Sequence, residues 1–232
     1  MCATSLLYIV YHKHLTRSHN LTRIPLLGLK IHNIHIKNTM SSFAKKGWHY
    51  IPNIITKEEA IQIKYQNLMG AVRDLGGLKT HHDPERGNVM TCYAPPSSTF
   101  VMKRIQPILE EALGEELIPT YWFTTTYHNK GWMNCHTDRP SCEVSVTMNI
   151  SGDAQWPIKL KDLTGKRREV VTPVGDGVAY LGTIVPHWRS PLRTHENDRF
   201  MQLFLHFVRK NGQYADYAYD RNQKCFDLLT GQ

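Results

Sequence analysis

The sequence predicts an α+β fold that is mainly β, with supporting helices packed on an antiparallel sandwich or barrel. Two helical patterns occupy the first half of the chain. From Leu117 onward, apolar and polar residues alternate at the period of β-strands. Roughly six to eight strands follow the helices, and helices first with strands afterwards is an order typical of α+β proteins.

The composition is that of an ordinary globular domain. The chain has 232 residues, 41% of them hydrophobic and 21% charged, so it can bury a sizeable core. Single β-rich domains routinely reach this length. No apolar run reaches about 18 residues, as a membrane-spanning helix would require. The five cysteines are scattered and form no C-x-x-C pair, which favours a reducing, cytoplasmic (intracellular) location.

The positive charge is concentrated at the N-terminus. The net charge is +8, but residues 1–39 hold five Lys or Arg and no Asp or Glu. The remaining 23 basic and 20 acidic residues leave +3 for residues 40–232, so nucleic acid is not the expected partner of this domain. The leader could be an organelle-targeting segment, a disordered nucleic-acid arm, or sequence upstream of a true start at Met40. We favour the last, because Met40 leads directly into an organised pattern.

The first helix begins with a capping box. Thr56 can cap the amide of Glu59, whose side chain can return to Thr56. Apolar residues then recur at helical spacing until about Gly70 or Gly76-Gly77. A second helix is predicted from Thr99 to Leu113, with Gly114 as its C-terminal cap; Pro107 in its interior indicates a kink or a later start.

The predicted strands share a period of two or a dense β-branched and aromatic content. They are Gly47–Ile51, Tyr121–Tyr127, Cys142–Ile150, Pro157–Lys161, Arg167–Thr172, Val178–Leu181 and Arg199–Val208. The fourth and fifth flank a Thr164-Gly165 turn and should form a hairpin. Residues 78–98, rich in Pro, Gly, His and Ser, are predicted to form a loop.

Three residues form a candidate metal site. His136-Thr137-Asp138 is an H-x-D motif, and positions two apart on a strand project to the same side. His187, in Pro186-His187-Trp188, follows the strand that begins after Gly175-Asp176-Gly177 and could be the third ligand. Two imidazoles and one carboxylate suit Fe(II) enzymes that activate O₂. The rival third ligands are His195, in a polar loop, and His206, on the strand face opposite Arg199.

A basic residue should bind a carboxylate in the same pocket. Arg199 opens the last predicted strand and could clamp the far carboxylate of a dicarboxylate such as 2-oxoglutarate. Strand alternation places it on one face with Met201, Leu203 and Leu205, which favours Arg199 over its rivals Arg189 and Arg193. Tyr127 is placed to donate its hydroxyl into the pocket. Thr147 could touch the cosubstrate or serve only in core packing.

The stretch from about Pro119 to Val208 resembles the double-stranded β-helix core of the Fe(II)/2-oxoglutarate dioxygenases, in particular the prolyl 4-hydroxylase-like branch. The resemblance is carried by Tyr127 with the H-x-D segment 136–143, by Gly175–Tyr180, by Pro186–Arg189 and by the tail Gln202–Val208. It is loose over residues 43–118. It implies a helical support at 54–114 and a double-stranded β-helix core at 117–210.

The resemblance also implies site roles and cofactors. Iron would be bound by His136, Asp138 and His187, while Arg199 and Tyr127 would bind 2-oxoglutarate. Fe(II), 2-oxoglutarate as cosubstrate and O₂ are implied, with ascorbate as a further candidate. The implied reaction hydroxylates a C–H bond of a peptidyl (prolyl-like) or small-molecule substrate and releases succinate and CO₂.

Two other functions stay open on the sequence. One is a cupin-like metalloenzyme that uses no 2-oxoglutarate, in which Arg199 would be structural. The other is a non-catalytic binding protein whose basic leader binds nucleic acid. The prime substrate and the oligomeric state are not predicted.

Overall fold

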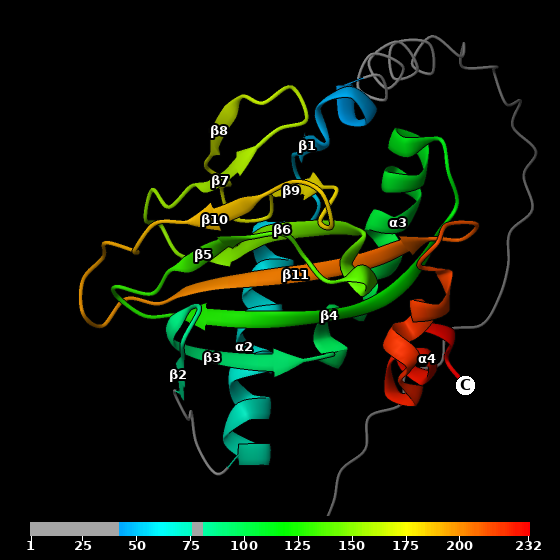
Figure 1. The fold of residues 1–232 in the computed structure, drawn as a ribbon. Coiled ribbons are helices and arrows are strands. Elements are labelled where there is room, and N and C mark those ends of the chain that lie inside the picture. Colours follow the sequence, from blue (N-terminus) through cyan, green and yellow to red (C-terminus); the bar gives the residue numbers. More distant parts are fainter. Residues whose placement is uncertain (1–41, 76–80) are drawn as a thin grey trace, which may run out of the picture.

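The computed structural model describes residues 42–75 and 81–232. The three interpretations of the basic leader, and the proposed helix end at Gly76-Gly77, lie outside the described residues. Within them, the mainly β architecture with supporting helices is confirmed: two antiparallel sheets are accompanied by a small number of helices (Figure 1).

The larger sheet has seven strands in the order β1-β9-β6-β11-β4-β3-β2, and every neighbouring pair is antiparallel. In chain order these strands are β1 (Trp48–Ile51), β2 (His81–Asp83), β3 (Gly87–Tyr93), β4 (Leu117–Tyr127), β6 (Val144–Ser151), β9 (Gly177–Tyr180) and β11 (Phe200–Arg209). The two longest, β4 and β11, pair along almost their whole length at the middle of the sheet.

The smaller sheet has four strands in the order β5-β10-β7-β8, again antiparallel. These strands are β5 (Met133–His136), β7 (Ile158–Lys161), β8 (Arg167–Val170) and β10 (His187–Arg189). The β7–β8 hairpin around Thr164-Gly165 is as predicted. From β4 onward the chain passes repeatedly between the two sheets, for example from β4 to β5 and from β9 to β10, so the two sheets are wound together as in a double-stranded β-helix.

Residues 42–46 are helical, and the longer helices are α2 (Lys57–Leu75), α3 (Thr99–Leu113) and α4 (Gln223–Thr230). Short 3₁₀ segments are η1 (Pro96–Ser98), η2 (Pro140–Cys142) and η3 (Ala215–Arg221). The capping box of α2 is confirmed: the Glu59 amide donates to Thr56 Oγ1 at 3.2 Å, and the Thr56 amide donates to Glu59 Oε2 at 2.9 Å. Helix α3 begins at Thr99 despite Pro107 and ends at Gly114, which has φ 73°. Helix α2 continues past Gly70.

The alternation of side chains along β11 separates two packing environments. Met201, Leu203 and Leu205 belong to the main core, together with Ile63 of α2 and Ile105 of α3. Phe200 and Phe204 belong instead to a second cluster that also contains Tyr127 and Trp156. The odd-numbered residues therefore pack with the supporting helices, and the even-numbered residues face the space between the sheets.

The expectation of a loop at residues 78–98 is wrong for much of its length. Strands β2 and β3 form a hairpin there, and β3 pairs with β4 from Val89 to Tyr93. The sequence signal for strand β3 is weak. Residues 89–93 favour a strand, but loop-forming residues surround them. No part of the sequence pattern predicted η3 or α4.

Among the described residues, no helix combines the length and the apolar character needed to cross a bilayer.

Replacing Leu205 with Ala should lower the free energy of unfolding by about 2–5 kcal/mol, because the buried side chain at the centre of β11 would leave a cavity. Urea unfolding followed by tryptophan fluorescence measures this loss. Ile61→Ala is the matched control, since Ile61 is 53% exposed on α2 and its loss should change stability by no more than about 0.5 kcal/mol. Equal losses in the two variants would contradict the assignment of the core.

Candidate metal centre

A cavity of about 400 Å³ lies between the two sheets. Residues of β4, β5, β9, β10 and β11 contribute to its wall. Its lining includes His136, Asp138 and His187 from the predicted metal site, and Tyr127. The structure therefore brings four of the six predicted site residues to one cavity, although they span 61 positions of sequence from Tyr127 to His187.

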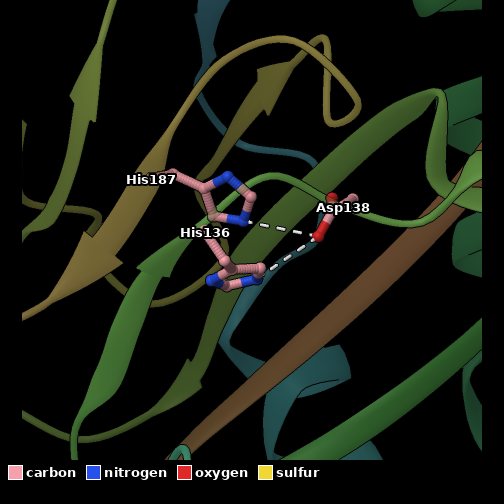
Figure 2. Close-up of side chains that lie close together, drawn as sticks. All are labelled: His136, Asp138 and His187. Atoms are coloured by element: carbon pink, nitrogen blue, oxygen red, sulfur yellow. Dashed lines mark ion pairs between the residues drawn. The ribbon is translucent and has the colours of Figure 1, made fainter.

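The three predicted metal ligands converge on one point. Nε2 of His136 and Nε2 of His187 each lie 3.5 Å from Oδ1 of Asp138. The two imidazole centroids are 4.4 Å apart. Figure 2 shows both rings directing a nitrogen at the carboxylate, with His136 and His187 on neighbouring strands and Asp138 in the segment after β5. These groups are close enough to share a single ion.

The pairing of β5 with β10 produces this convergence. His136 and His187 are direct partners in the antiparallel ladder, so their side chains leave the sheet side by side. Asp138 lies two residues beyond His136, and its amide donates to the carbonyl of Gly182 at 2.8 Å. This backbone bond fixes the carboxylate-bearing residue next to the two rings.

Backbone carbonyls orient both rings. Nδ1 of His136 lies 2.7 Å from the carbonyl oxygen of Asn134, and Nδ1 of His187 lies 3.0 Å from that of Val185. A carbonyl only accepts, so each Nδ1 must carry the proton and each Nε2 is left with its lone pair. This is the arrangement by which metal-binding histidines are commonly held in one tautomer.

The electrostatics favour an ionised Asp138. Burial alone would raise its pKa, but the two imidazoles of His136 and His187 beside the carboxylate outweigh burial, so the pKa is lowered. In turn, the hydrogen bond with Asp138 raises the pKa of His136. Protons and a cation therefore compete for the same donor atoms, as expected of a metal site.

Gly182 allows the close approach of the elements around Asp138. A Cβ at this position would collide with the Cys142 carbonyl, with Asp138 Oδ2 and with Ser145 Oγ. The Gly182 amide also donates to the Glu143 carbonyl at 3.0 Å. No local motif marks Gly182 in the sequence, because its packing partners lie about 40 positions away along the chain.

Arg199 is not brought to this cavity. It is exposed, its guanidinium donates to the carbonyls of Glu196 and Asp198, and it lines a different hollow. Strand alternation predicted it on the face of Met201 and Leu203; those two residues do share a face, but Arg199 precedes the strand. The face, however, is the one that packs against the helices, so the inference that Arg199 faces the pocket is corrected.

Arg189, one of the two rivals, is buried near the site. It follows His187 by two positions on β10 and is 1% exposed. Its Nη2 donates to Gln202 Oε1 at 3.1 Å, its Nη1 donates to the Trp156 carbonyl, and the guanidinium stacks on the Trp156 ring at 4.8 Å. Arg193, the other rival, is exposed in the loop before β11.

The guanidinium of Arg189 has no acidic partner in the described part of the chain. Among the described residues no carboxylate forms an ion pair with it, and its buried Nε has no hydrogen-bond partner. Burial lowers its pKa to about 10, although Tyr127 and Tyr180 nearby act in the opposite direction. Arg189 does not line the cavity itself, but both of these tyrosines do. Burying a guanidinium without an ion-pair partner has a large desolvation cost, which a bound anion would offset.

Tyr127 and Thr147 have different surroundings. Tyr127 lines the cavity and is fully buried, and its hydroxyl has no partner among the described residues; burial raises its pKa to about 12. Thr147 does not line the cavity. It donates to Gln202 Oε1 at 3.1 Å, the same oxygen that receives Arg189 Nη2, so it supports the arginine indirectly.

The two rival histidines are far from equivalent. His195 is exposed in the loop before β11, where its amide donates to Asp198 Oδ2. His206 is 3% exposed, lines the cavity, and forms with Asp138 and Cys142 a second group close enough to contact one ion. Burial raises the pKa of the Cys142 thiol to about 12, which makes it a poor ligand at neutral pH.

The fold is similar to that of several solved structures. A Pseudomonas putida prolyl-4-hydroxylase is 16% identical, with 75% of this chain and 98% of that chain covered and a TM-score of 0.57. A prolyl hydroxylase from Trichoplax adhaerens, in complex with a hypoxia inducible factor peptide fragment, is 10% identical, with 86% and 98% covered and a TM-score of 0.63. HygX from Streptomyces hygroscopicus, with nickel and 2-oxoglutarate bound, is 11% identical, with 75% and 87% covered and a TM-score of 0.56.

No family model matches the sequence. No curated protein matches it either. The similarity to the solved structures therefore establishes the fold alone: this chain has the double-stranded β-helix fold of the 2-oxoglutarate and Fe(II) oxygenases, as the sequence predicted.

Replacing His206 with Phe should reduce the sensitivity of the protein to acid. Burial lowers the pKa of His206 from 6.5 to about 4. Between these values the unfolded chain binds a proton that the folded chain does not, so stability falls as the pH falls through this window. The wild type should lose about 2–3 kcal/mol more than the variant between pH 7 and pH 4.5. Urea unfolding at both pH values measures the difference, and equal losses would contradict a neutral buried His206.

Proposed function

We propose that the protein is an Fe(II)- and 2-oxoglutarate-dependent oxygenase. The observation that carries the proposal is the convergence of His136 and His187 on one oxygen of Asp138 inside a cavity of this fold. The fold alone does not assign an activity, because one fold hosts many functions. The donor set at the site supports the assignment.

The residues present fit an iron ion. Two neutral imidazole Nε2 atoms and one ionised carboxylate on one side of a cavity are the donor set of non-haem Fe(II) oxygenases, which leave further coordination positions for other ligands. Both imidazoles are held in the tautomer that ligation requires. We therefore assign His136, Asp138 and His187 as the metal ligands.

The residues present also fit the cosubstrate. The buried Arg189 charge lacks an anion, and the Tyr127 hydroxyl lacks a partner among the described residues. His187 and Arg189 are two residues apart on β10, roughly 6.6 Å, which is comparable to the length of a five-carbon dicarboxylate. We assign Arg189, rather than Arg199, to the far carboxylate of 2-oxoglutarate, with Tyr127 as a second donor. Gln202 and Thr147 hold the guanidinium in place.

Bound iron with 2-oxoglutarate and O₂ would supply the oxidising chemistry that hydroxylates a C–H bond and leaves succinate and CO₂. The chain itself provides orientation and exclusion of water. Tyr121, Phe123 and Phe204 give the cavity an aromatic wall against which a substrate can pack. The prolyl hydroxylases among the structural neighbours favour a peptidyl, prolyl-like substrate, with a small molecule as the alternative.

Replacing His136 with Ala should abolish Fe(II)-dependent conversion of 2-oxoglutarate to succinate, because one of three ligands is removed. The half-exposed ring is not part of the core, so circular dichroism should show the fold retained. Anaerobic reconstitution with Fe(II) and 2-oxoglutarate, followed by a screen of peptidyl and small-molecule substrates for stimulated succinate release, provides the assay. His195→Ala is the control and should keep wild-type turnover. Full activity of His136→Ala would remove the metal assignment, and iron binding without succinate formation would favour a cupin-like enzyme.

Replacing Arg189 with Lys should weaken 2-oxoglutarate binding about 10–100-fold, since the charge is kept but the paired hydrogen bonds of the guanidinium are lost. Equilibrium dialysis of 2-oxoglutarate against the anaerobic Fe(II)-loaded protein measures the affinity. Arg199→Lys is the matched control and should bind like the wild type. Weaker binding in Arg199→Lys, with Arg189→Lys folded and unaffected, would return the clamp to Arg199.

A further inference from the structure

A chain of buried hydrogen bonds leads from Asp138 away from the two imidazoles. Ser145 Oγ donates to Asp138 Oδ2 at 2.8 Å. On its other side, Ser145 Oγ lies 2.9 Å from Nδ1 of His206. Ser145 is completely buried and His206 nearly so, so neither group is exposed to bulk water. The chain joins β6 and β11 of the large sheet to the segment that carries Asp138.

The donor and the acceptor of each hydrogen bond follow from which of these atoms carry a proton. The Ser145 hydroxyl has one proton, and an ionised carboxylate is the stronger of its available acceptors, since the Cys142 carbonyl is neutral and lies at 3.1 Å. Ser145 Oγ must then accept from His206, which places the proton of that ring on Nδ1. The position of the His206 proton is inferred from these hydrogen bonds. In this tautomer the buried Nε2 carries no proton. It has no partner among the described residues, but no N–H is left without an acceptor.

The His206 ring is held by packing. It stacks on Tyr121 with a centroid separation of 4.6 Å, and on Phe123 at 5.7 Å. The guanidinium of Arg139 lies over the Tyr121 ring at 4.6 Å from its centroid, and Arg139 is paired with Asp220. The donor nitrogen of His206 is therefore fixed in direction before any ligand binds.

We propose that Ser145 and His206 are positioning residues for the metal site. Ser145 holds Asp138 Oδ2, and this turns Oδ1 toward the two imidazole Nε2 atoms; His206 holds the Ser145 hydroxyl in the donating orientation. Among the described residues, Ser145 supplies the one side-chain hydrogen bond that Asp138 receives from outside the triad. The proposal rests on the proposed function, because it takes the triad to be a metal site.

Metal affinity tests the proposal without any need for turnover. Co²⁺ is titrated into the metal-free, full-length protein and its visible absorption is recorded. Ser145→Ala should weaken Co²⁺ binding about 10–100-fold, the usual cost of losing a residue that orients a ligand. His206→Phe, which keeps the ring stacking but removes the N–H, should also weaken binding. His206→Asn should restore part of it, because its amide N–H can replace that of Nδ1.

The control is Ser98→Ala. Ser98 is a fully buried serine whose Oγ has no hydrogen-bond partner among the described residues, so the same chemical change should leave Co²⁺ affinity at the wild-type value. If Ser145→Ala does not fold, the comparison of His206→Phe with His206→Asn decides. Wild-type affinity in Ser145→Ala and His206→Phe, with binding lost in His136→Ala, would overturn the positioning role alone. Failure of the wild type to bind Co²⁺ would instead overturn the proposed function.

Discussion

The site depends on one backbone pairing, that of β5 with β10. The register sets His136 directly opposite His187, so two imidazoles separated by 51 positions leave neighbouring strands on the same side. Asp138 follows His136 by two positions, and the hydrogen bond from its amide to the Gly182 carbonyl holds it beside the two imidazoles. A slip of one residue in this ladder would send one imidazole to the opposite face of the sheet. The rest of the fold can be understood as the support that keeps the short β10 strand in register between β5 and β7.

A second constraint is the burial of charge around the cavity. The neighbouring His136 and His187 lower the pKa of Asp138, and Ser145 donates to its Oδ2. Arg189 is more deeply buried, at 1% exposure, but no carboxylate of the described part of the chain pairs with it. Gln202 and the Trp156 carbonyl accept two of its protons, and the aromatic ring of Trp156 covers it. The protein therefore maintains a buried cation close to the candidate metal site, and an anion is the kind of ligand that would pair with it.

Strand β11 shows why a correct pattern can support a wrong assignment. The alternation along this strand was visible in the sequence, including the separation of His206 from Arg199. The sequence did not reveal which face of β11 lines the cavity, because the residues on both faces are buried. One face packs on the helices and the other lines the space between the sheets, and only the packing distinguishes them. Phe204 and His206 consequently lie in the cavity wall, and Arg199 lies in the loop that precedes the strand.

The sequence by itself determined the helix at Thr99–Leu113, the capping box of α2, the hairpin around Thr164-Gly165 and the identity of the candidate metal ligands. These features depend on residues that are close along the chain, or on residue types whose chemistry restricts their use. The tertiary structure decided which arginine is buried beside the site, why residue 182 must be Gly, and how Ser145 and His206 reach Asp138. Each of these depends on contacts between strands remote in sequence, where one residue of register or one choice of sheet face changes every neighbour.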